Sequence, residues 1–459
     1  MMLRPARASF GTLSDSRGRP HSGRFGSDAV RLARWAWYHL CSFELVFVLF
    51  FFSNQLKLLP GFPSLPADET VVLMALSMPI GLYVIFRQGI YLPGLPIVAA
   101  GLALFGWATL SWGWSPSRVL ASRTLSYLFT FNLWCLIAGA LVLAPSRERV
   151  LRFLAFMLFF SMVIAGYGLG VYTVYGTFKF AKAFGDVKRV YLSWGYAATN
   201  GAIIAFGLFL FSRMLSLRQI AAALLFGVSS AFLLVGSGRG PLLGVVIACL
   251  VALASGLPRI GRERIEVPRW QLLGLGAVVL GVGYIVWLAE TGTTFATFGR
   301  FMKLLEEAEN PDVVQGPNRF AYFAAAIRFW LESPIIGNGI ASFSLLFSHA
   351  EISGTQPHNI ILEMLTDLGL VGLALLLWTL WSGLRCVQLP RLRVDGLQLC
   401  VLMLLSSRLL AAMISVDISG QQAMFLFLGL LAMRPPPGFA APSRRSAARA
   451  QSDRILERA

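Results

Sequence analysis

The amino-acid sequence predicts an all-α integral membrane protein with about twelve membrane-spanning helices and one large extracytoplasmic loop. Of its 459 residues, 56% are hydrophobic and only 13% are charged. Apolar runs close to the roughly 20 residues that a helix needs to cross a bilayer recur along the chain. The formal charge of +17 comes mostly from arginines at the ends of these runs and in both tails. Because this distribution is typical of membrane topology, it argues against a nucleic-acid partner.

The chain divides into two tails and a membrane domain. Residues 1–38 hold seven arginines and no apolar run, which is typical of a disordered cytoplasmic tail rather than a cleavable signal. Residues 39–433 form the predicted helical domain, and the Pro-, Ala- and Arg-rich residues 434–459 form a second basic tail near anionic lipid. The predicted spans are 40–52, 69–86, 92–112, 124–144, 151–175, 193–212, 219–236, 241–257, 271–289, 360–384, 395–414 and 421–433.

The distribution of Lys and Arg predicts the orientation of these spans. With the N-terminus in the cytoplasm, the segments that fall on the inner side hold most of the basic residues, as cytoplasmic loops do. The clearest case is the short segment 258–269, whose arginines are Arg259, Arg262, Arg264 and Arg269. Both termini are then cytoplasmic, and the long loop 290–359 is extracytoplasmic.

An amphipathic helix is expected within this loop, over Asn318–Glu332. Its apolar side chains recur on one face, which favours a helix that lies on the membrane surface. They are Phe320, Phe323, Ala324, Ile327, Trp330 and Leu331. Asn318 is the expected N-cap. Arg319, in the first turn, would offer a phosphate its guanidinium together with free backbone N–H groups. Arg328, at the opposite border, is a weaker candidate for substrate binding, because a contact with lipid headgroups explains it better.

Two histidines follow the helix-breaking segment Ser333–Gly339. The apolar run Phe343–Phe347 is expected to touch the bilayer again, and His349 comes directly after it. His358, followed by Asn359, lies at the start of the span 360–384, where the helix dipole favours a bound anion. Imidazole exchanges a proton near neutral pH, which suits activation of a sugar hydroxyl, so His358 is the candidate catalytic residue. His349 and Asn359 are further candidates for substrate binding.

Another arginine reaches the outer side from a different part of the chain. A short turn, Ser237–Pro241, joins two apolar runs and keeps Arg239 near the outer membrane face. Arg239 and Arg319 could hold a diphosphate while a hydroxyl beside His358 attacks the attached sugar. The outer loops contain no carboxylate cluster with metal-ligand spacing, so the expected chemistry needs no metal and no other cofactor.

The spacing after the second histidine resembles a known family. His358-Asn359 is followed after nine residues by Gly369-x-x-Gly372, which resembles the signature of bacterial O-antigen ligases and the related O-antigen and exopolysaccharide polymerases. The preceding segment Pro334–Phe343 is also similar to that family, and Arg239 and Arg319 stand where arginines of the family are expected. The resemblance covers about residues 230–375. One departure is Gly238, where the family often has Ser directly before the first arginine.

The resemblance implies a glycosyltransferase C-like fold in the bacterial inner membrane, with a periplasmic catalytic loop at 290–359. Such a protein takes a glycan from undecaprenyl diphosphate, with arginines on the diphosphate and the histidine near the attacking hydroxyl. In a ligase the acceptor is a sugar of the lipid A core, whereas in a polymerase it is another lipid-linked repeat unit. The expected partners are therefore this lipid-linked glycan, an acceptor glycan or glycolipid, and membrane lipids. The residues do not distinguish a ligase from a polymerase. They also leave open whether His358 acts as a base or positions other groups.

Ionisable residues within or near the spans keep a transporter or flippase open as a rival class. Charge is costly at membrane depth and is usually paired or functional. The residues concerned are Glu44, Glu363, Asp367 and Arg408. Glu363 and Asp367 lie one helical turn apart, so either could pair with Arg408 and brace the helices. A structural scaffold is disfavoured by the outer arginines and histidine.

Overall fold

The computed structural model describes residues 42–59, 67–175, 190–212, 215–236, 238–255, 259–260, 265–266, 319–388, 392, 395–415 and 417–436. Within these ranges the chain is almost entirely helical. Their one strand pair joins two residues of β1 (Arg259–Ile260) to two of β2 (Ile265–Glu266). The predicted all-α class is therefore confirmed. The expected span 271–289, the N-terminal tail, residues 437–459 of the C-terminal tail and residues 290–318 of the long loop lie outside the described residues.

Eight helices of the described part are long and apolar enough to cross a membrane. They are α3 (Glu69–Gln88), α4 (Leu95–Ser111) with its leading turn η2 (Leu92–Gly94), the continuous run α5 (Arg118–Tyr127), η3 (Leu128–Asn132), α6 (Leu133–Ile137) and η4 (Ala138–Leu143), then α7 (Arg147–Tyr175), α9 (Val190–Phe211), α10 (Leu217–Val235), α16 (Ile360–Leu384) and α18 (Gly396–Ile414). Three shorter apolar helices are α2 (Phe43–Leu56), α11 (Arg239–Ser255) and α19 (Gln422–Leu430). Each coincides with a predicted span, so the multi-pass architecture is confirmed, while the total of about twelve stays a prediction.

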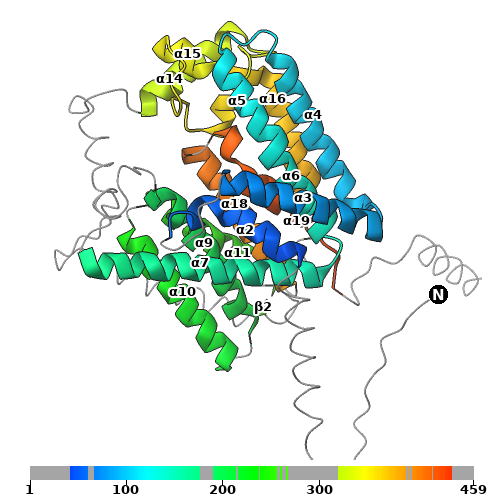
Figure 1. Cartoon of the computed structure of the whole chain (residues 1–459), viewed down its shortest axis with the longest axis vertical. Helices are drawn as coiled ribbons and strands as arrows, with labels where there is room; N and C mark the ends of the chain where they lie inside the picture. The colour runs from blue at the N-terminus through cyan, green and yellow to red at the C-terminus, as the bar shows by residue number, and fades with distance from the viewer. Residues whose placement is uncertain are drawn as a thin grey trace, which may run out of the picture.

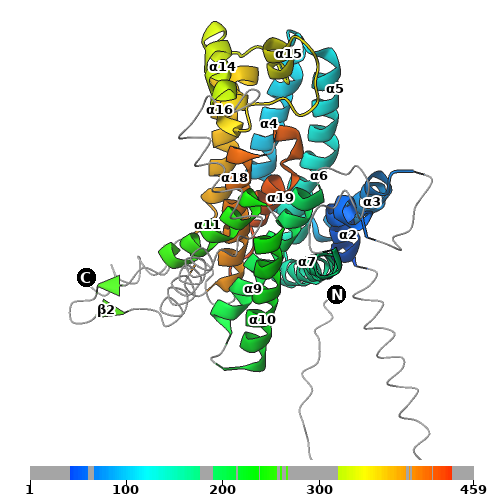
Figure 2. The ribbon, with the colours of Figure 1, turned by 90° about the vertical axis from the view of Figure 1, so that its left-hand side faces the viewer.

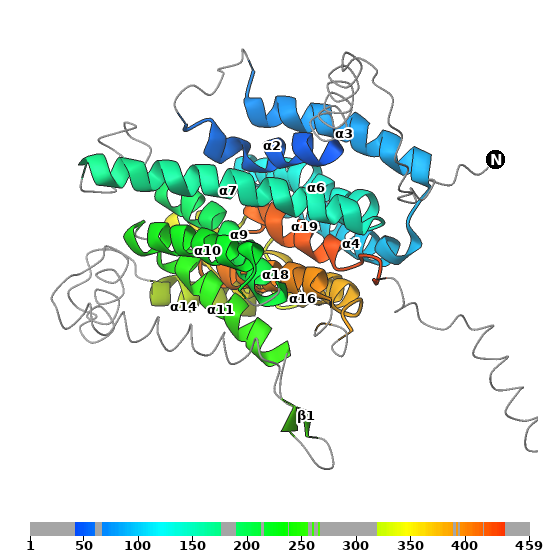
Figure 3. The same ribbon diagram turned by 90° about the horizontal axis from the view of Figure 1, so that it is seen from below.

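The described helices form two groups that lie toward opposite ends of the molecule. Figures 1 and 2 show α4, α5 and α16 toward one end, together with α14 (Arg319–Glu332) and α15 (Phe343–Ser348). The pair α9 and α10 lies toward the other end, and α18 packs against both α9 and α11. Seen from below, α2 lies between α3 and α7 (Figure 3). The starts of α9, α11 and α14 are thereby brought near the end of α18.

Buried carboxylates beside α7 have basic partners. Glu44, 2% exposed on α2, accepts from Arg152 at 3.3 Å and lies 3.9 Å from Arg149. Asp395, also buried, forms a bidentate pair with Arg147 at 2.7 and 2.8 Å. Breaking a buried pair leaves an uncompensated charge, so these contacts hold α2 and the start of α18 against α7. Glu44 is therefore paired with basic residues and helps to hold α2 against α7.

Helix α16 is interrupted at Gly369, and the segment before α15 fills the interruption. Gly369 has φ 66° and ψ −164°, so the backbone N–H groups that follow it lack their helical acceptors. Pro334 accepts from the N–H of Leu370 at 2.9 Å, and the N–H of Asn338 donates to the oxygen of Thr366 at 2.9 Å. The break is therefore satisfied by backbone groups that are far away in sequence.

Glycine is required on both sides of this contact. A Cβ on Gly369 would clash with the backbone oxygen of Ile335, and one on Gly337 would lie 2.5 Å from the amide nitrogen of Gly369. Both glycines also have positive φ, 73° at Gly337 and 66° at Gly369, which residues with a Cβ rarely adopt. The first glycine of the motif Gly369-x-x-Gly372 thus has a structural explanation. It lets α16 break and receive the chain that leads to α15.

Candidate active site at the ends of α9, α11, α16 and α18

A series of contacts links His358 to the start of α11. The side-chain nitrogen Nε2 of Gln356 lies 3.4 Å from Nδ1 of His358 and 3.4 Å from the backbone oxygen of Ser415, which follows α18. Gly240, in the first turn of α11, is so close to α9 and α18 that an added Cβ would lie 3.0 Å from Oη of Tyr196 and 3.5 Å from Oγ of Ser415. The segment before α16, the end of α18 and the start of α11 therefore meet beside Tyr196 of α9.

Both candidate arginines begin helices at this meeting point. Arg239 is the half-buried first residue of α11 and directly precedes Gly240, which contacts Tyr196. Arg319 is the exposed first residue of α14, and it lies close enough to Tyr196 for an electrostatic interaction. The structure thus brings together two arginines and a histidine that are far apart in sequence. Their roles on a substrate stay predictions.

His358 precedes α16 in a left-handed backbone conformation, with φ 54°. The N-cap is the next residue, Asn359, whose side-chain oxygen accepts from the N–H groups of Ile361 and Leu362 at 3.0 and 3.2 Å. These two N–H groups are therefore occupied by the cap, and an anion favoured by the helix dipole beside His358 stays a prediction. A substrate contact by Asn359 stays a prediction, and its side-chain oxygen is already used in capping. The ring of Tyr322 lies edge-on to the His358 ring, with centroids 6.0 Å apart.

Helix α14 has a second apolar face that the periodicity did not reveal. Tyr322 and Phe329 pack against Phe343 of α15, with ring centroids 6.0 Å apart in each pair. Phe343 is only 2% exposed, so the expectation that the run Phe343–Phe347 touches the bilayer is wrong for its first residue. Residues of the predicted apolar face stay exposed, among them Phe320, Ile327 and Leu331. The helix itself is confirmed, and its location on the membrane surface stays a prediction.

The two weaker candidates lie on the outside of this region. Arg328 is exposed and its guanidinium stacks 4.9 Å over the ring of its neighbour Phe329. His349 is exposed and ends α15 in a left-handed conformation with φ 55°. The contacts around Tyr196 described above involve neither residue. Substrate binding by either one stays a prediction.

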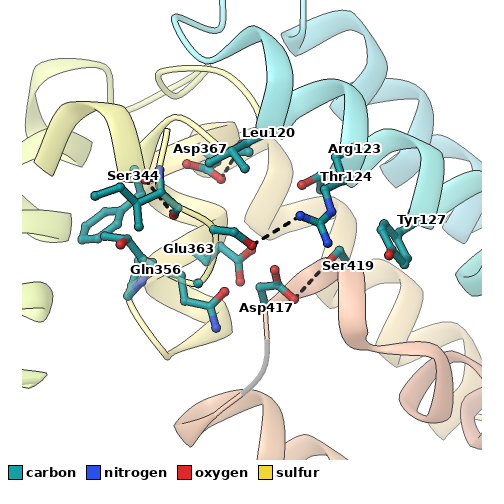
Figure 4. Close-up of a pocket in the computed structure, with 17 residues that line it drawn as sticks. Leu120, Arg123, Thr124, Tyr127, Ser344, Gln356, Glu363, Asp367, Asp417 and Ser419 are labelled. Atoms are coloured by element: carbon teal, nitrogen blue, oxygen red, sulfur yellow. Dashed lines mark hydrogen bonds between the residues drawn. The ribbon is translucent and has the colours of Figure 1, made fainter. Parts of the chain in front are cut away.

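A polar pocket of about 240 Å³ opens beside Gln356. Figure 4 shows Arg123 and Tyr127 of α5, together with Glu363 and Asp417, around the same space as Gln356. The pocket lining thus combines carboxylates, a cation, an amide and an aromatic ring. Hydroxyl-rich ligands suit such a surface, because these groups can accept from and donate to several hydroxyls while a ring covers an apolar face.

The acidic residues of α16 bind backbone groups rather than Arg408. Glu363 accepts from the N–H of Ile418 at 3.1 Å, and Asp367 accepts from the N–H of Ala341 at 2.8 Å. The expected pairing of either carboxylate with Arg408 is therefore wrong. The physical reason is that two loops approach α16 at these positions and bring buried N–H groups that need acceptors. Both carboxylates still brace the structure, through loops instead of through α18.

Three residues of this region were not singled out from the sequence. Tyr196 is one tyrosine within a predicted span, Ser415 lies at a span end, and only tertiary contacts give either one significance. Gln356 could have been noticed, because a polar side chain two residues before His358 lies within reach of the imidazole. Within the described ranges, no three His, Cys, Asp or Glu side chains are grouped so as to hold a metal ion. Metal independence stays a prediction.

Comparison with known proteins gives one family match. Residues 222–377 match the family model described as O-antigen ligase. A search of curated proteins found no match to the chain. The matched residues include Arg239, Arg319, His358 and the break at Gly369. The match confirms the relationship that the histidine motif indicated, and it supports a ligase or polymerase type of function on lipid-linked glycan.

Proposed function

We propose that this multi-pass membrane protein, related to the O-antigen ligases through its residues 222–377, transfers a glycan from undecaprenyl diphosphate to an acceptor sugar hydroxyl. The reaction takes place at the periplasmic face of a bacterial inner membrane. The observation that carries the proposal is the convergence of the starts of α11 and α14 with His358 around Tyr196 and Ser415. At this place the two arginines could bind the negatively charged diphosphate, and His358 could contact the sugar hydroxyl beside it.

In this proposal Arg239 and Arg319 bind the diphosphate. Charge-assisted hydrogen bonds from guanidinium to phosphate are strong and can be bidentate. Their contribution grows as the bond to the sugar breaks, because negative charge then accumulates on the leaving diphosphate. A diphosphate leaves without being protonated, so charge neutralisation is the main demand on the protein.

His358 contacts the attacking hydroxyl, and its neighbours favour a donor role for it. The side-chain amide nitrogen of Gln356 can only donate a hydrogen bond. Because the backbone oxygen of Ser415 can only accept, Nε2 of Gln356 rather than Oε1 must point toward Ser415. Nδ1 of His358, 3.4 Å from the same nitrogen, then accepts. A neutral imidazole that accepts at Nδ1 carries its proton at Nε2. His358 therefore orients the hydroxyl or its neighbours by donation rather than by removing a proton.

The acceptor sugar lies in the polar pocket beside Gln356. Its carboxylates and amide can bind hydroxyls, and Tyr127 can cover one face of a sugar ring. Both a lipid A core sugar and a lipid-linked repeat unit carry such hydroxyls. A deletion strain separates the two reactions. Loss of capped lipopolysaccharide with long lipid-linked chains retained indicates a ligase, whereas accumulation of single repeat units indicates a polymerase.

The proposal is tested directly with purified protein in lipid nanodiscs supplied with lipid-linked glycan and acceptor. Transfer is measured as the appearance of glycosylated acceptor together with free undecaprenyl diphosphate, and the His358→Ala protein is the control. In proteoliposomes, movement of intact lipid-linked glycan to the opposite leaflet, without any glycosidic bond breaking, would instead establish the transporter class. Chromatography detects the covalent products of transfer, and the accessibility of the glycan from outside the vesicle detects movement.

A further inference from the structure

Arg408 lies inside α18 and has no carboxylate partner among the described residues. Its Nη2 donates to Oδ1 of Asn200 at 2.6 Å and to the backbone oxygen of Tyr196 at 3.0 Å. The guanidinium also lies 4.9 Å over the ring of Tyr196. Its Nε is buried and has no acceptor. Among the described residues, the guanidinium thus contacts two neutral oxygens and a ring.

Two other arginines next to the helix bundle are neutralised by carboxylates. Arg147 forms its bidentate pair with Asp395, and Arg152 lies 3.3 Å from Glu44. A cation within a membrane span is costly, and it is usually either paired with an anion or used for function. Because Arg408 is not paired with an acidic residue in the described part of the chain, its charge is available to an anion from outside the protein.

Arg408 also lines a cavity of about 270 Å³ between α2, α9, α18 and the start of α19. Among the described residues of its lining, Arg408 is the one charged residue, and none is acidic. Much of the remaining wall is apolar, with Phe51, Phe52 and Ala197 as examples, and the side-chain oxygen of Gln55 is buried there without a donor. A cavity of this kind suits an amphiphilic anion better than a soluble one.

The position of Arg408 along α18 fits the head of a membrane lipid. It lies six residues before Ile414, the last residue of the helix, which is about 9 Å at roughly 1.5 Å per residue. Tyr196, which Arg408 stacks on, also contacts the start of α11 and interacts with Arg319. The cavity therefore adjoins the place assigned above to the diphosphate.

We propose that the cavity lined by Arg408 binds the phosphate group of a membrane lipid, with the lipid chain along its apolar wall. Guanidinium is well matched to phosphate oxygens, and Arg408 supplies the guanidinium in the wall of this cavity. Resting on the proposed function, the inference adds that the occupant is the polyprenyl diphosphate donor. Arg408 is then a third arginine on the donor, beyond Arg239 and Arg319.

Binding can be measured without turnover. The full-length protein in phosphatidylcholine nanodiscs is titrated with farnesyl diphosphate, with phosphatidylglycerol and with inorganic diphosphate, and the dissociation constants and ligand-induced shifts of the thermal unfolding midpoint are compared. The dissociation constant of farnesyl diphosphate is expected to rise at least tenfold in Arg408→Gln and by a smaller factor in Arg408→Lys. Arg152→Gln makes the same change at an arginine that does not line the cavity, so it controls for loss of a partly buried arginine and is expected to keep the affinity.

The outcomes separate the alternatives. Weaker binding in Arg408→Gln with normal binding in Arg152→Gln supports the site, and preference for farnesyl diphosphate over phosphatidylglycerol identifies a carrier lipid rather than a phospholipid. Unchanged binding in Arg408→Gln overturns the inference, as does an equal loss in both variants, which means a general effect of losing a partly buried arginine. Equal binding of inorganic and farnesyl diphosphate overturns the role of the apolar wall. None of these results affects the proposed function, because glycan transfer and its loss in His358→Ala are scored separately.

Discussion

The side-chain nitrogen of Gln356 lies 3.4 Å from Nδ1 of His358. Because the same nitrogen also approaches the backbone oxygen of Ser415 at 3.4 Å, the orientation of the amide is determined by an acceptor that cannot change its role. This relationship bears on the chemistry of the candidate site. It makes Nδ1 the accepting nitrogen and leaves the proton of the neutral ring on Nε2.

Replacement of His358 by Asn tests this donor role. Asn can donate a hydrogen bond but cannot accept a proton at neutral pH, and it tolerates the left-handed conformation of φ 54° better than most residues. Measurable transfer by His358→Asn is expected, whereas His358→Ala abolishes transfer with normal membrane insertion. Complete loss in the Asn variant at equal protein level would point to proton removal. Full activity of the Ala variant would exclude His358 from the mechanism.

Replacement of Gln356 by Ala removes the group that selects the tautomer of His358. A neutral hydrogen bond contributes about 0.5–1.5 kcal/mol, so the rate of transfer is expected to fall roughly 2- to 10-fold. Gln88→Ala is the matched control, because Gln88 also donates to a backbone oxygen, that of Leu141, away from the site. Initial rates at matched protein levels measure both variants, and equal rates would remove Gln356 from the site.

Arg319 and Arg328 lie on the same helix and offer a direct comparison. Arg319→Lys keeps the charge but loses the planar fork that binds two phosphate oxygens, so transfer should fall about 10- to 100-fold if a charge-assisted bond of about 1.5–3 kcal/mol is lost in the transition state. Arg328→Lys should have a small effect, because Arg328 is exposed and stacks on Phe329. Small and equal effects in an in vitro transfer assay would indicate that both arginines contact lipid headgroups.

Gly369→Ala should prevent correct assembly of α16. The added Cβ would meet the backbone oxygen of Ile335, and φ of 66° costs a residue with a Cβ about 1–2 kcal/mol even without that clash. Gly170→Ala, on a helical residue with open space around it, should leave the protein as stable as before. Size-exclusion profiles and unfolding midpoints in detergent test the pair. A Gly369→Ala protein with a normal profile and midpoint would contradict the account of the break.

The predicted topology is tested with reporter fusions at Arg264 and at Gln356. The basic segment 258–269 is expected in the cytoplasm and the approach to His358 in the periplasm, because the charge asymmetry orients the spans between them. Alkaline phosphatase should therefore be active only at Gln356, and a cytoplasmic fluorescent reporter only at Arg264. Activity of one reporter at both positions would remove the external site.

Most spans could be predicted because the signal for a span is local. Helix α16 begins and ends where its apolar run does, at Ile360 and Leu384. The motif at His358 was equally visible, since its spacing lies within one short stretch of sequence. The partners of Glu363 and Asp367 were not visible, because their N–H donors, those of Ile418 and Ala341, come from loops far along the chain.

The sequence by itself determined that the chain crosses a membrane many times and that an amphipathic helix precedes the histidine motif. It also identified the arginines that are candidates for diphosphate binding. Apolar length, helical periodicity and motif spacing are properties of short segments, so no long-range contact is needed to recognise them. Only the tertiary structure decided that Gln356 and Ser415 join His358 to Tyr196, that α16 breaks to accept the backbone of residues 334–339, and that Arg408 faces a cavity without an acidic partner in the described chain. These features depend on which helix ends meet, and packing between distant segments determines that.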